Sequence, residues 1–229
     1  MVMTFALFGL SFIGPQFFQA VKGVNPQGTG LRLLAMVGGL LLGSVLGNGL
    51  LARFGAKLST ALGFALLAAG LLLGSLTHVA SGTGFVLGWM ALMGVGTGFV
   101  LPATMATALA ALPTEHAGVG SSVIMAVRMG GGAFGVALLG SILNGLYRGH
   151  LLMTGLPAQA SAAVHKSVFG GIAAAGSLLS SSLLAHVRTA FTSSMDTVLL
   201  ICGVIAVAGI LLGYRFHAAG RCKGSGERD

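Results

Sequence analysis

The feature that most constrains this chain is a series of apolar runs, each about as long as a bilayer is thick. A helix needs about 20 mostly apolar residues to cross the hydrocarbon core. We expect six such spans, at residues 2–20, 31–52, 59–76, 84–112, 119–146 and 195–214. The prediction is therefore an all-α membrane protein, a six-helix bundle that occupies residues 1–214.

The scarcity of charge supports a membrane environment. Only 7% of the residues are charged, whereas 55% are hydrophobic, and a soluble domain has about a quarter of its residues charged. So few charges cannot cover a water-exposed surface. The net charge of +8 does not indicate nucleic-acid binding, because the basic residues stand singly and are not clustered on one element. We expect the lipid bilayer as a partner and exclude nucleic acid.

The segment at residues 147–194 is read as an external loop with one or two amphipathic helices on the membrane surface. Within it, residues 167–187 are apolar enough to be read as a span instead, and both interpretations stay open. Six spans place both termini, including the tail at 215–229, on the same side as the Arg53–Lys57 connection. Short basic connections favour the cytoplasmic side, which predicts a multi-pass protein of the plasma membrane, most simply a bacterial inner membrane.

Glycines recur at intervals of four residues inside three of the expected spans. They are Gly39, Gly43 and Gly47, then Gly94 and Gly98, then Gly131 and Gly135. Small residues at this interval let two helix backbones approach closely in lipid. The pattern predicts tight helix packing and, by itself, assigns these positions no contact with a substrate.

No pattern of catalytic residues is present, so we expect no enzyme activity, no cofactor and no metal. The four carboxylates are Glu115, Asp196, Glu227 and Asp229, and none is placed to act with a buried histidine and serine. The glycine run at 94–98 lies within an expected span and lacks the strand and helix that a phosphate-binding loop requires. The cysteines, Cys202 and Cys222, show no metal-binding spacing.

Arg128 is the most informative single residue. It lies about 15 Å into its expected span, where a charge costs several kcal/mol unless it faces protein, water or a counter-ion. One interpretation is a cation that lines a substrate cavity. The other is a structural residue that bonds backbone carbonyls of a neighbouring helix, and the sequence leaves both open.

Other polar residues near the ends of the spans are weaker candidates. Gln16 and Gln19 lie near the end of the first span and could bond a substrate, a neighbouring helix or the headgroup layer. Asp196 begins the last expected span, where a carboxylate caps a helix favourably. A role for Asp196 in proton handling is the alternative.

Several methionines provide adaptable apolar surface. Met has a flexible, polarisable side chain that suits promiscuous pockets. Met93 and Met125 are the candidates for a substrate cavity, and Met90, Met105 and Met129 share the same chemistry. For each of them, ordinary packing between helices is the competing interpretation.

An ordered set of short stretches covers nearly the whole chain. It includes Pro15-Gln16-Phe17-Phe18-Gln19, Gly30-Leu31-Arg32, Arg53-Phe54-Gly55-Ala56-Lys57, Gly94 to Gly98 with Pro102, and Arg128-Met129-Gly130-Gly131. In this order the stretches resemble the carboxyl-terminal half of fourteen-span, QacA-like multidrug:proton antiporters of the major facilitator superfamily. The resemblance implies an alternating-access exporter of lipophilic or cationic compounds, with substrate bound between two bundles.

The resemblance also implies a partner and a moving loop. An amino-terminal transporter half, on the same longer chain or on a separate one, would complete the exporter, and Arg53, Gly55 and Lys57 would lie at the rim that meets it. The chain departs from the family in having six expected spans and no carboxylate deep inside any of them. The alternatives are a membrane assembly subunit that does not transport and a half-transporter that pairs with itself.

Overall fold

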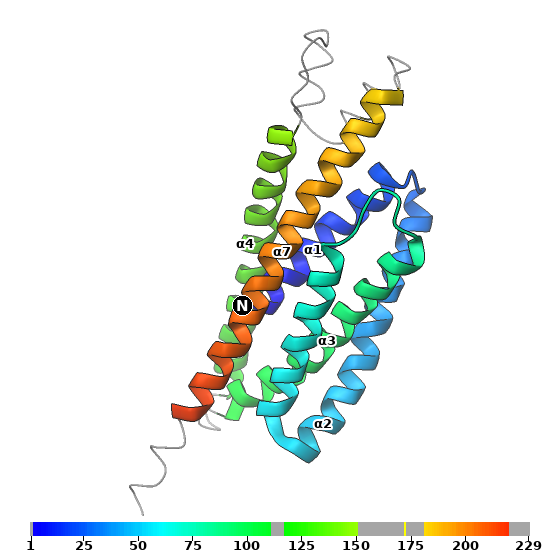
Figure 1. Cartoon of the computed structure of the whole chain (residues 1–229). Coiled ribbons are helices and arrows are strands. Elements are labelled where there is room, and N and C mark those ends of the chain that lie inside the picture. The colour runs from blue at the N-terminus through cyan, green and yellow to red at the C-terminus, as the bar shows by residue number, and fades with distance from the viewer. Residues whose placement is uncertain (1, 111–116, 151–171, 173–180, 220–229) are drawn as a thin grey trace, which may run out of the picture.

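The structure is a computed structural model that describes residues 2–110, 117–150, 172 and 181–219. Within this part of the chain every regular element is a helix, and no strand occurs. The elements are α1 (Val2–Gln16), the π-helix η1 (Phe17–Val21), α2 (Pro26–Gly74), α3 (Thr83–Ala110), α4 (Ala117–His150) and α7 (Ser181–Ala219) (Figure 1). The all-α prediction is confirmed, and the helices lie side by side as a bundle.

α2 contains two of the expected spans in one bent element. It is 49 residues long, and its only non-helical backbone lies at Gly55 (φ 80°, ψ 170°). The chain reverses there, so that the two arms of α2 run antiparallel (Figure 1). The structure therefore has five α-helices in its described part where we expected six. A positive φ suits glycine, which has no Cβ to clash with the backbone.

Four of these helices are long and apolar enough to cross a bilayer. They are α2 and the segments Thr83–Ala108, Gly118–His150 and Ser182–Gly209. A straight helix of the length of α2 would measure about 73 Å, more than twice the roughly 30 Å of a hydrocarbon core. The bend at Gly55 removes this mismatch.

The glycine repeats bring α2 and α3 into backbone contact, as predicted. A Cβ on Gly39 or Gly43 would collide with the backbone carbonyl oxygen of Ala91 or Val95. From the other side, a Cβ on Gly94 would collide with the carbonyl oxygen of Met36. Close approach of this kind stabilises helix pairs in lipid through van der Waals contact.

Glycines also mark where the other helices meet. On α4, Gly132 and Gly140 lie against Phe8 and Phe12 of α1. The predicted pair Gly131 and Gly135 is buried on the same helix.

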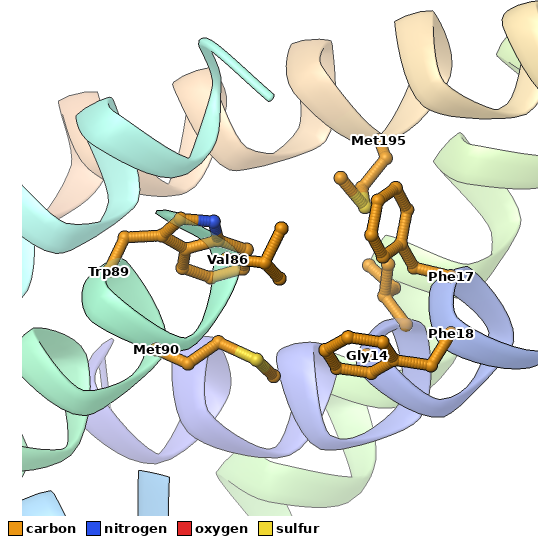
Figure 2. A pocket seen from close by; sticks show the side chains of 8 residues that line it. Gly14, Phe17, Phe18, Val86, Trp89, Met90 and Met195 are labelled. Carbon is orange, nitrogen blue, oxygen red and sulfur yellow. The ribbon is translucent and has the colours of Figure 1, made fainter. Parts of the chain in front are cut away.

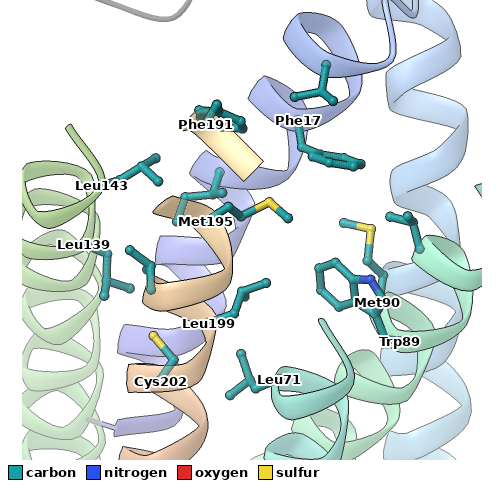
Figure 3. Packing of buried hydrophobic residues seen from close by; sticks show 14 of the residues in the cluster. Phe17, Leu71, Trp89, Met90, Leu139, Leu143, Phe191, Met195, Leu199 and Cys202 are labelled. Carbon is teal, nitrogen blue, oxygen red and sulfur yellow. The ribbon is translucent and has the colours of Figure 1, made fainter. Parts of the chain in front are cut away.

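The apolar core surrounds α7. Met195, Leu199 and Cys202 of α7 are buried together with Leu139 of α4 and Leu71 of α2 (Figure 3). Many large apolar side chains are nevertheless exposed along the first arm of α2 and along α4, among them Leu31, Leu41, Val45, Val119 and Phe134. An apolar core inside and an apolar surface outside are the arrangement expected of helices in lipid.

We expected residues 147–194 to form a surface loop, but both ends of this segment belong to the long helices α4 and α7. α4 continues to His150, and α7 begins at Ser181 and runs without a break into the last expected span. Residues 181–194 therefore belong to the same helix as Met195 and not to a separate surface helix. Apart from Ile172, residues 151–180 lie outside the described part, as do the connection at 111–116 and the end of the tail at 220–229.

Candidate functional site

An apolar cavity lies where α1, η1, α3 and α7 meet (Figure 2). Its walls include Phe17 and Phe18 from η1, Trp89 and Met90 from α3, and Met195 from α7. The space left between these side chains has room for about one water molecule. In this conformation the cavity is closed to a drug-sized molecule, which needs at least about 300 Å³.

The π-helix explains why two adjacent rings face the cavity. Pro15 has no backbone N–H and lies inside α1, so the helical hydrogen bond to the carbonyl of Ser11 is missing. The chain continues as a π-helix from Phe17 to Val21, and such turns occur often at functional sites. Phe17 and Phe18 are both buried, with ring centroids 5.7 Å apart and planes at 71°.

Trp89 contributes a polar group that has no partner. Its side chain is 3% exposed, and its indole nitrogen is buried without a hydrogen bond. The benzo edge of the ring lies against α2, since a Cβ on Gly74 would be 3.1 Å from Trp89 Cε3. A buried indole N–H normally has an acceptor, and this one has none among the described residues.

A positive charge lies over the Phe18 ring. The guanidinium carbon of Arg32, on α2, is 5.6 Å from the centroid of that ring. One terminal nitrogen of Arg32 is buried and has no hydrogen-bond partner. The arrangement is a cation–π contact, and it gives the edge of the cavity a positive potential.

Lys22 closes the same end of the bundle. Its ammonium group donates hydrogen bonds to the backbone carbonyls of Val79 and Ser81, in the connection between α2 and α3. We call this end of the bundle, with Lys22 and the connection at 75–82, the Lys22 end. The opposite end contains the bend at Gly55.

The two glutamines and two methionines predicted for a cavity do not line this one. Gln16 ends α1 and Gln19 lies in η1, and both are half-buried. Met93 is fully buried between α3 and the second arm of α2, where a Cβ on Gly70 would be 2.7 Å from Met93 Cγ. Met125 is 42% exposed on α4. In this conformation Met93 is therefore a packing residue between helices.

Arg128 lies on α4 with its Nε atom buried and without a hydrogen-bond partner. It precedes Gly132 by four residues, so it shares the face of α4 that contacts α1. The remainder of the side chain is half-buried. A buried guanidinium N–H without an acceptor is costly, so an acceptor from another molecule or bundle would stabilise it.

Asp196 does not begin a helix, and that prediction is wrong. α7 begins at Ser181, which places Asp196 about 22 Å along the helix. Leu199, three residues after Asp196, lies against the end of α2. Its Cδ1 atom would be 3.1 Å from a Cβ on Gly74. One carboxylate oxygen of Asp196 is buried and has no hydrogen-bond partner. Within the candidate span Ser182–Gly209, Asp196 lies toward the Lys22 end, one turn before the level at which α2 ends.

The residues predicted for the moving loop lie together at the bend of α2. Arg53 is exposed, Gly55 adopts the positive φ, and Lys57 is half-buried. Sequence reasoning missed Trp89, Lys22 and the pairing of Arg32 with Phe18. The signals available were that Trp89 is the only tryptophan and that Phe17 and Phe18 follow a proline inside a span.

Comparison with known proteins identifies relatives. Residues 1–136 match the family described as Major Facilitator Superfamily. The chain is 34% identical to Multidrug resistance protein Stp of Mycobacterium tuberculosis over 139 residues, 61% of this chain and 26% of that protein. It is 28% identical to the Tetracenomycin C resistance and export protein of Streptomyces glaucescens over 218 residues, 88% of this chain and 40% of that protein.

A third relative has a similar name. The chain is 28% identical to Multidrug transporter protein MdtP of Bacillus subtilis over 166 residues, 69% of this chain and 30% of that protein. The matched region thus spans 26% of the first relative, 40% of the second and 30% of the third.

Proposed function

The chain belongs to the major facilitator superfamily, and from this premise we propose that it forms one of the two membrane bundles of a multidrug efflux transporter. It is a transport protein and not an enzyme, and a multi-pass protein of the plasma membrane. The observation that carries the proposal is the family match over residues 1–136 together with relatives named for multidrug resistance and export. The partner bundle would lie on the same longer chain or on a separate one.

In this proposal the bundle crosses the membrane six times. Each arm of α2 counts as one crossing, because the chain reverses at Gly55. The bend at Gly55 and both termini lie in the cytoplasm, and the Lys22 end faces the outside. This orientation rests on the short basic connection that contains Arg53 and Lys57.

Transport would follow the alternating-access scheme of the superfamily, in which two bundles rock around a central site. Gln16, Gln19, Met125 and Arg128 would face the cavity shared with the partner bundle. Met93 would be a packing residue, because it is fully buried between α3 and the second arm of α2 of this bundle. Arg128 would meet a carboxylate of the partner or an acceptor atom of the substrate. The buried, unpartnered Nε atom of Arg128 supports this role.

Asp196 would couple export to the proton gradient. Its side chain has a buried oxygen without a partner and lies on the Lys22 end of α7. A carboxylate at this position can take up a proton from the outside and release it after the bundles rock. Arg53, Gly55 and Lys57 would contact the partner bundle at the cytoplasmic rim in one of the two states.

A chimera tests the proposal. In the Mycobacterium tuberculosis relative, the matched segment is exchanged for the corresponding residues of this chain, and efflux of ethidium from bacterial cells is measured. We expect the chimera to export ethidium and the chain alone to show no export. A chimera that reaches the membrane in normal amount and exports nothing contradicts the proposal and favours a membrane assembly subunit.

A further inference from the structure

Two buried polar atoms without a hydrogen-bond partner belong to the two sides of the seam between α7 and the second arm of α2. One is the Oδ1 atom of Asp196, on α7, and the other is the hydroxyl oxygen of Thr77, in the turn that follows α2. Thr77 is fully buried and Asp196 is half-buried. A buried polar group without a partner is costly, so a bond between these two groups would remove both costs.

The contacts along the seam show that α7 and the second arm of α2 run antiparallel. Toward the bend of α2, a Cβ on Gly209 would lie 3.4 Å from Phe64 Cε1. Ten residues earlier on α7 and ten residues later on α2, Leu199 Cδ1 would lie 3.1 Å from a Cβ on Gly74. Residue numbers therefore fall along α7 as they rise along α2. Buried side chains of both helices meet on these facing sides (Figure 3).

Asp196 lies on the face of α7 that follows this seam. It precedes Leu199 by three residues and Gly203 by seven, and residues at these intervals share one face of a helix. Gly203 also contacts the second arm of α2, since its Cβ would be 3.0 Å from Leu72 Cδ2. The face that carries Asp196 is therefore directed at α2 and at the turn that follows it.

The same register brings Asp196 level with Thr77. Leu199 is opposite Gly74, so Asp196, one turn nearer the Lys22 end, is opposite the residues that follow Gly74. Thr77 lies three residues after Gly74, and its backbone N–H donates a 3.1 Å hydrogen bond to the Gly74 carbonyl. This bond holds the turn close to the end of the helix, which keeps the Thr77 side chain at the seam.

A hydroxyl group suits a carboxyl group that gains and loses a proton. The threonine hydroxyl can donate one hydrogen bond and accept others, whereas an ionised carboxylate only accepts. A bond from the hydroxyl to the carboxylate is charge-assisted, and it is stronger than a bond between neutral groups. In an apolar seam such a donor offsets the burial that disfavours the charged form.

The other charged and titratable groups toward this end of the bundle carry no negative charge at neutral pH. They are Lys22 after η1, His78 in the turn, Arg32 on the first arm of α2, Tyr147, Arg148 and His150 on α4, and His186 and Arg188 on α7. No second carboxylate occurs in the described part of the chain, so no like charge from these residues opposes ionisation of Asp196.

We propose that Thr77 positions the proton site at Asp196 by donating a hydrogen bond to its carboxylate when the proton leaves. The inference rests on the proposed export function, in which Asp196 couples transport to the proton gradient. The proton passes from the carboxyl group to water, and the Thr77 hydroxyl rotates to donate to the oxygen left behind. In the ionised state this bond joins α7 to the end of α2, and it weakens when a proton returns.

The full chain in lipid nanodiscs provides the test, with NMR of an isotope-labelled carboxyl carbon reporting the proton on Asp196. The sequence contains two aspartates, Asp196 and Asp229, so aspartate labelling in an Asp229→Asn background leaves one signal. We expect Thr77→Val to move the titration midpoint of this signal upward by about one to two pH units, because the carboxylate loses its donor. Thr77→Ser keeps the hydroxyl and should restore the midpoint.

A control separates the hydroxyl of Thr77 from other changes in the turn. Ser75→Ala removes a hydroxyl that already donates to the carbonyl of Leu72 at 2.8 Å, so the midpoint should stay in place. Thr77→Ala removes the Thr77 hydroxyl without adding bulk, and it should shift the midpoint even if Thr77→Val does not fold. An unchanged midpoint in the Thr77 variants that fold, or an equal shift in Ser75→Ala, overturns the proposal.

The result in nanodiscs is separate from the result for transport. Transport is measured in a chimera in which this chain replaces the matched segment of the Streptomyces glaucescens relative, a match that covers 88% of this chain. If Thr77→Val shifts the midpoint and export does not depend on Asp196, the hydrogen bond stands and the coupling function is wrong. If export depends on Asp196 and Thr77→Val leaves the midpoint unchanged, the coupling function stands and Thr77 is not its partner.

Discussion

The ammonium group of Lys22 donates a 2.6 Å hydrogen bond to the backbone carbonyl of Ser81, and a second bond of 2.9 Å to that of Val79. Lys22 lies directly after the π-helix, and the two acceptors lie in the turn between α2 and α3. The same turn is closed by the backbone N–H of His78, which donates to the Ser81 hydroxyl. One side chain thus joins the end of α1 and η1 to the hairpin of α2 and α3.

Removing this ammonium group should loosen the turn. We expect Lys22→Met to lower the free energy of unfolding by about 1–3 kcal/mol, because two charge-assisted hydrogen bonds are lost and two carbonyls are left unpaired. Amide hydrogen exchange of the turn should also accelerate. Lys22→Arg keeps a donor group and should lose less, and equal exchange rates in all three proteins would show that the contact has no structural weight.

The seam between α2 and α3 should not tolerate even a methyl group. Gly43→Ala places a Cβ against the carbonyl oxygen of Val95, so the helices must separate, at a cost of about 1–3 kcal/mol. The matched control is Gly49→Ala on the same helix, where nothing lies within 4 Å. That variant should be neutral or more stable by up to about 1 kcal/mol, since alanine is the better helix former. Thermal unfolding in detergent measures both, and equal midpoints would contradict the packing described above.

The bend of α2 depends on backbone conformation and not on space. No atom lies within 4 Å of a Cβ built on Gly55, yet its φ is +80°. Gly55→Ala should therefore cost about 1–3 kcal/mol through backbone strain alone. The difference between its thermal unfolding midpoint and that of Gly49→Ala measures the cost of the backbone strain. A variant as stable as the Gly49→Ala control would show that the bend does not need a positive φ.

Arg128 should be required for transport and not for folding. In the ethidium-exporting chimera, Arg128→Ala should reduce export by at least about tenfold, since the buried guanidinium is proposed to meet a carboxylate or a substrate. Met129→Ala, at the exposed neighbouring position, should export normally. Membrane abundance is measured alongside, and unchanged export by Arg128→Ala at normal abundance would remove the assigned role.

Asp196 should determine the response of export to the proton gradient. The test uses a chimera in which this chain replaces the matched segment of the Streptomyces glaucescens relative, a match that covers 88% of this chain. In that chimera Asp196→Asn cannot release a proton, so we expect active export to stop while binding of substrate persists. Asp196→Glu keeps the carboxylate and should retain part of the activity. Export is followed while the proton gradient is collapsed with an uncoupler. If Asp196→Asn still exports and still responds to the uncoupler, proton coupling lies elsewhere.

The features that the sequence predicted best are those with a local physical cause. The apolar runs predicted an all-helical membrane protein, and the glycine interval predicted close helix contact. The close backbone approach at Gly43 is of the kind that the interval predicts, because only small residues permit it in lipid. Its partner, Val95 of α3, could not be predicted from the interval.

The candidate site was harder to predict because it is assembled from distant segments. Trp89 and Met195 line the same cavity from separate helices, and no spacing in the sequence indicates that arrangement. Asp196 was misplaced because hydropathy locates the apolar part of a helix and not its first residue, which for α7 is Ser181. The contacts of Lys22 could not be predicted, since its acceptors are backbone carbonyls that leave no signal in the sequence.

The central claim is that this bundle crosses the membrane six times with its two ends on opposite sides. The direct measurement is labelling of single cysteines in intact cells with a membrane-impermeant maleimide, in a background where Cys202 and Cys222 are serine. Ala80→Cys and Gly149→Cys are exposed positions at or near the Lys22 end, and Arg53→Cys is exposed at the bend of α2. The account predicts that the first two react in intact cells and that Arg53→Cys reacts only after permeabilisation. Labelling of Ala80→Cys and Arg53→Cys from the same side would contradict it.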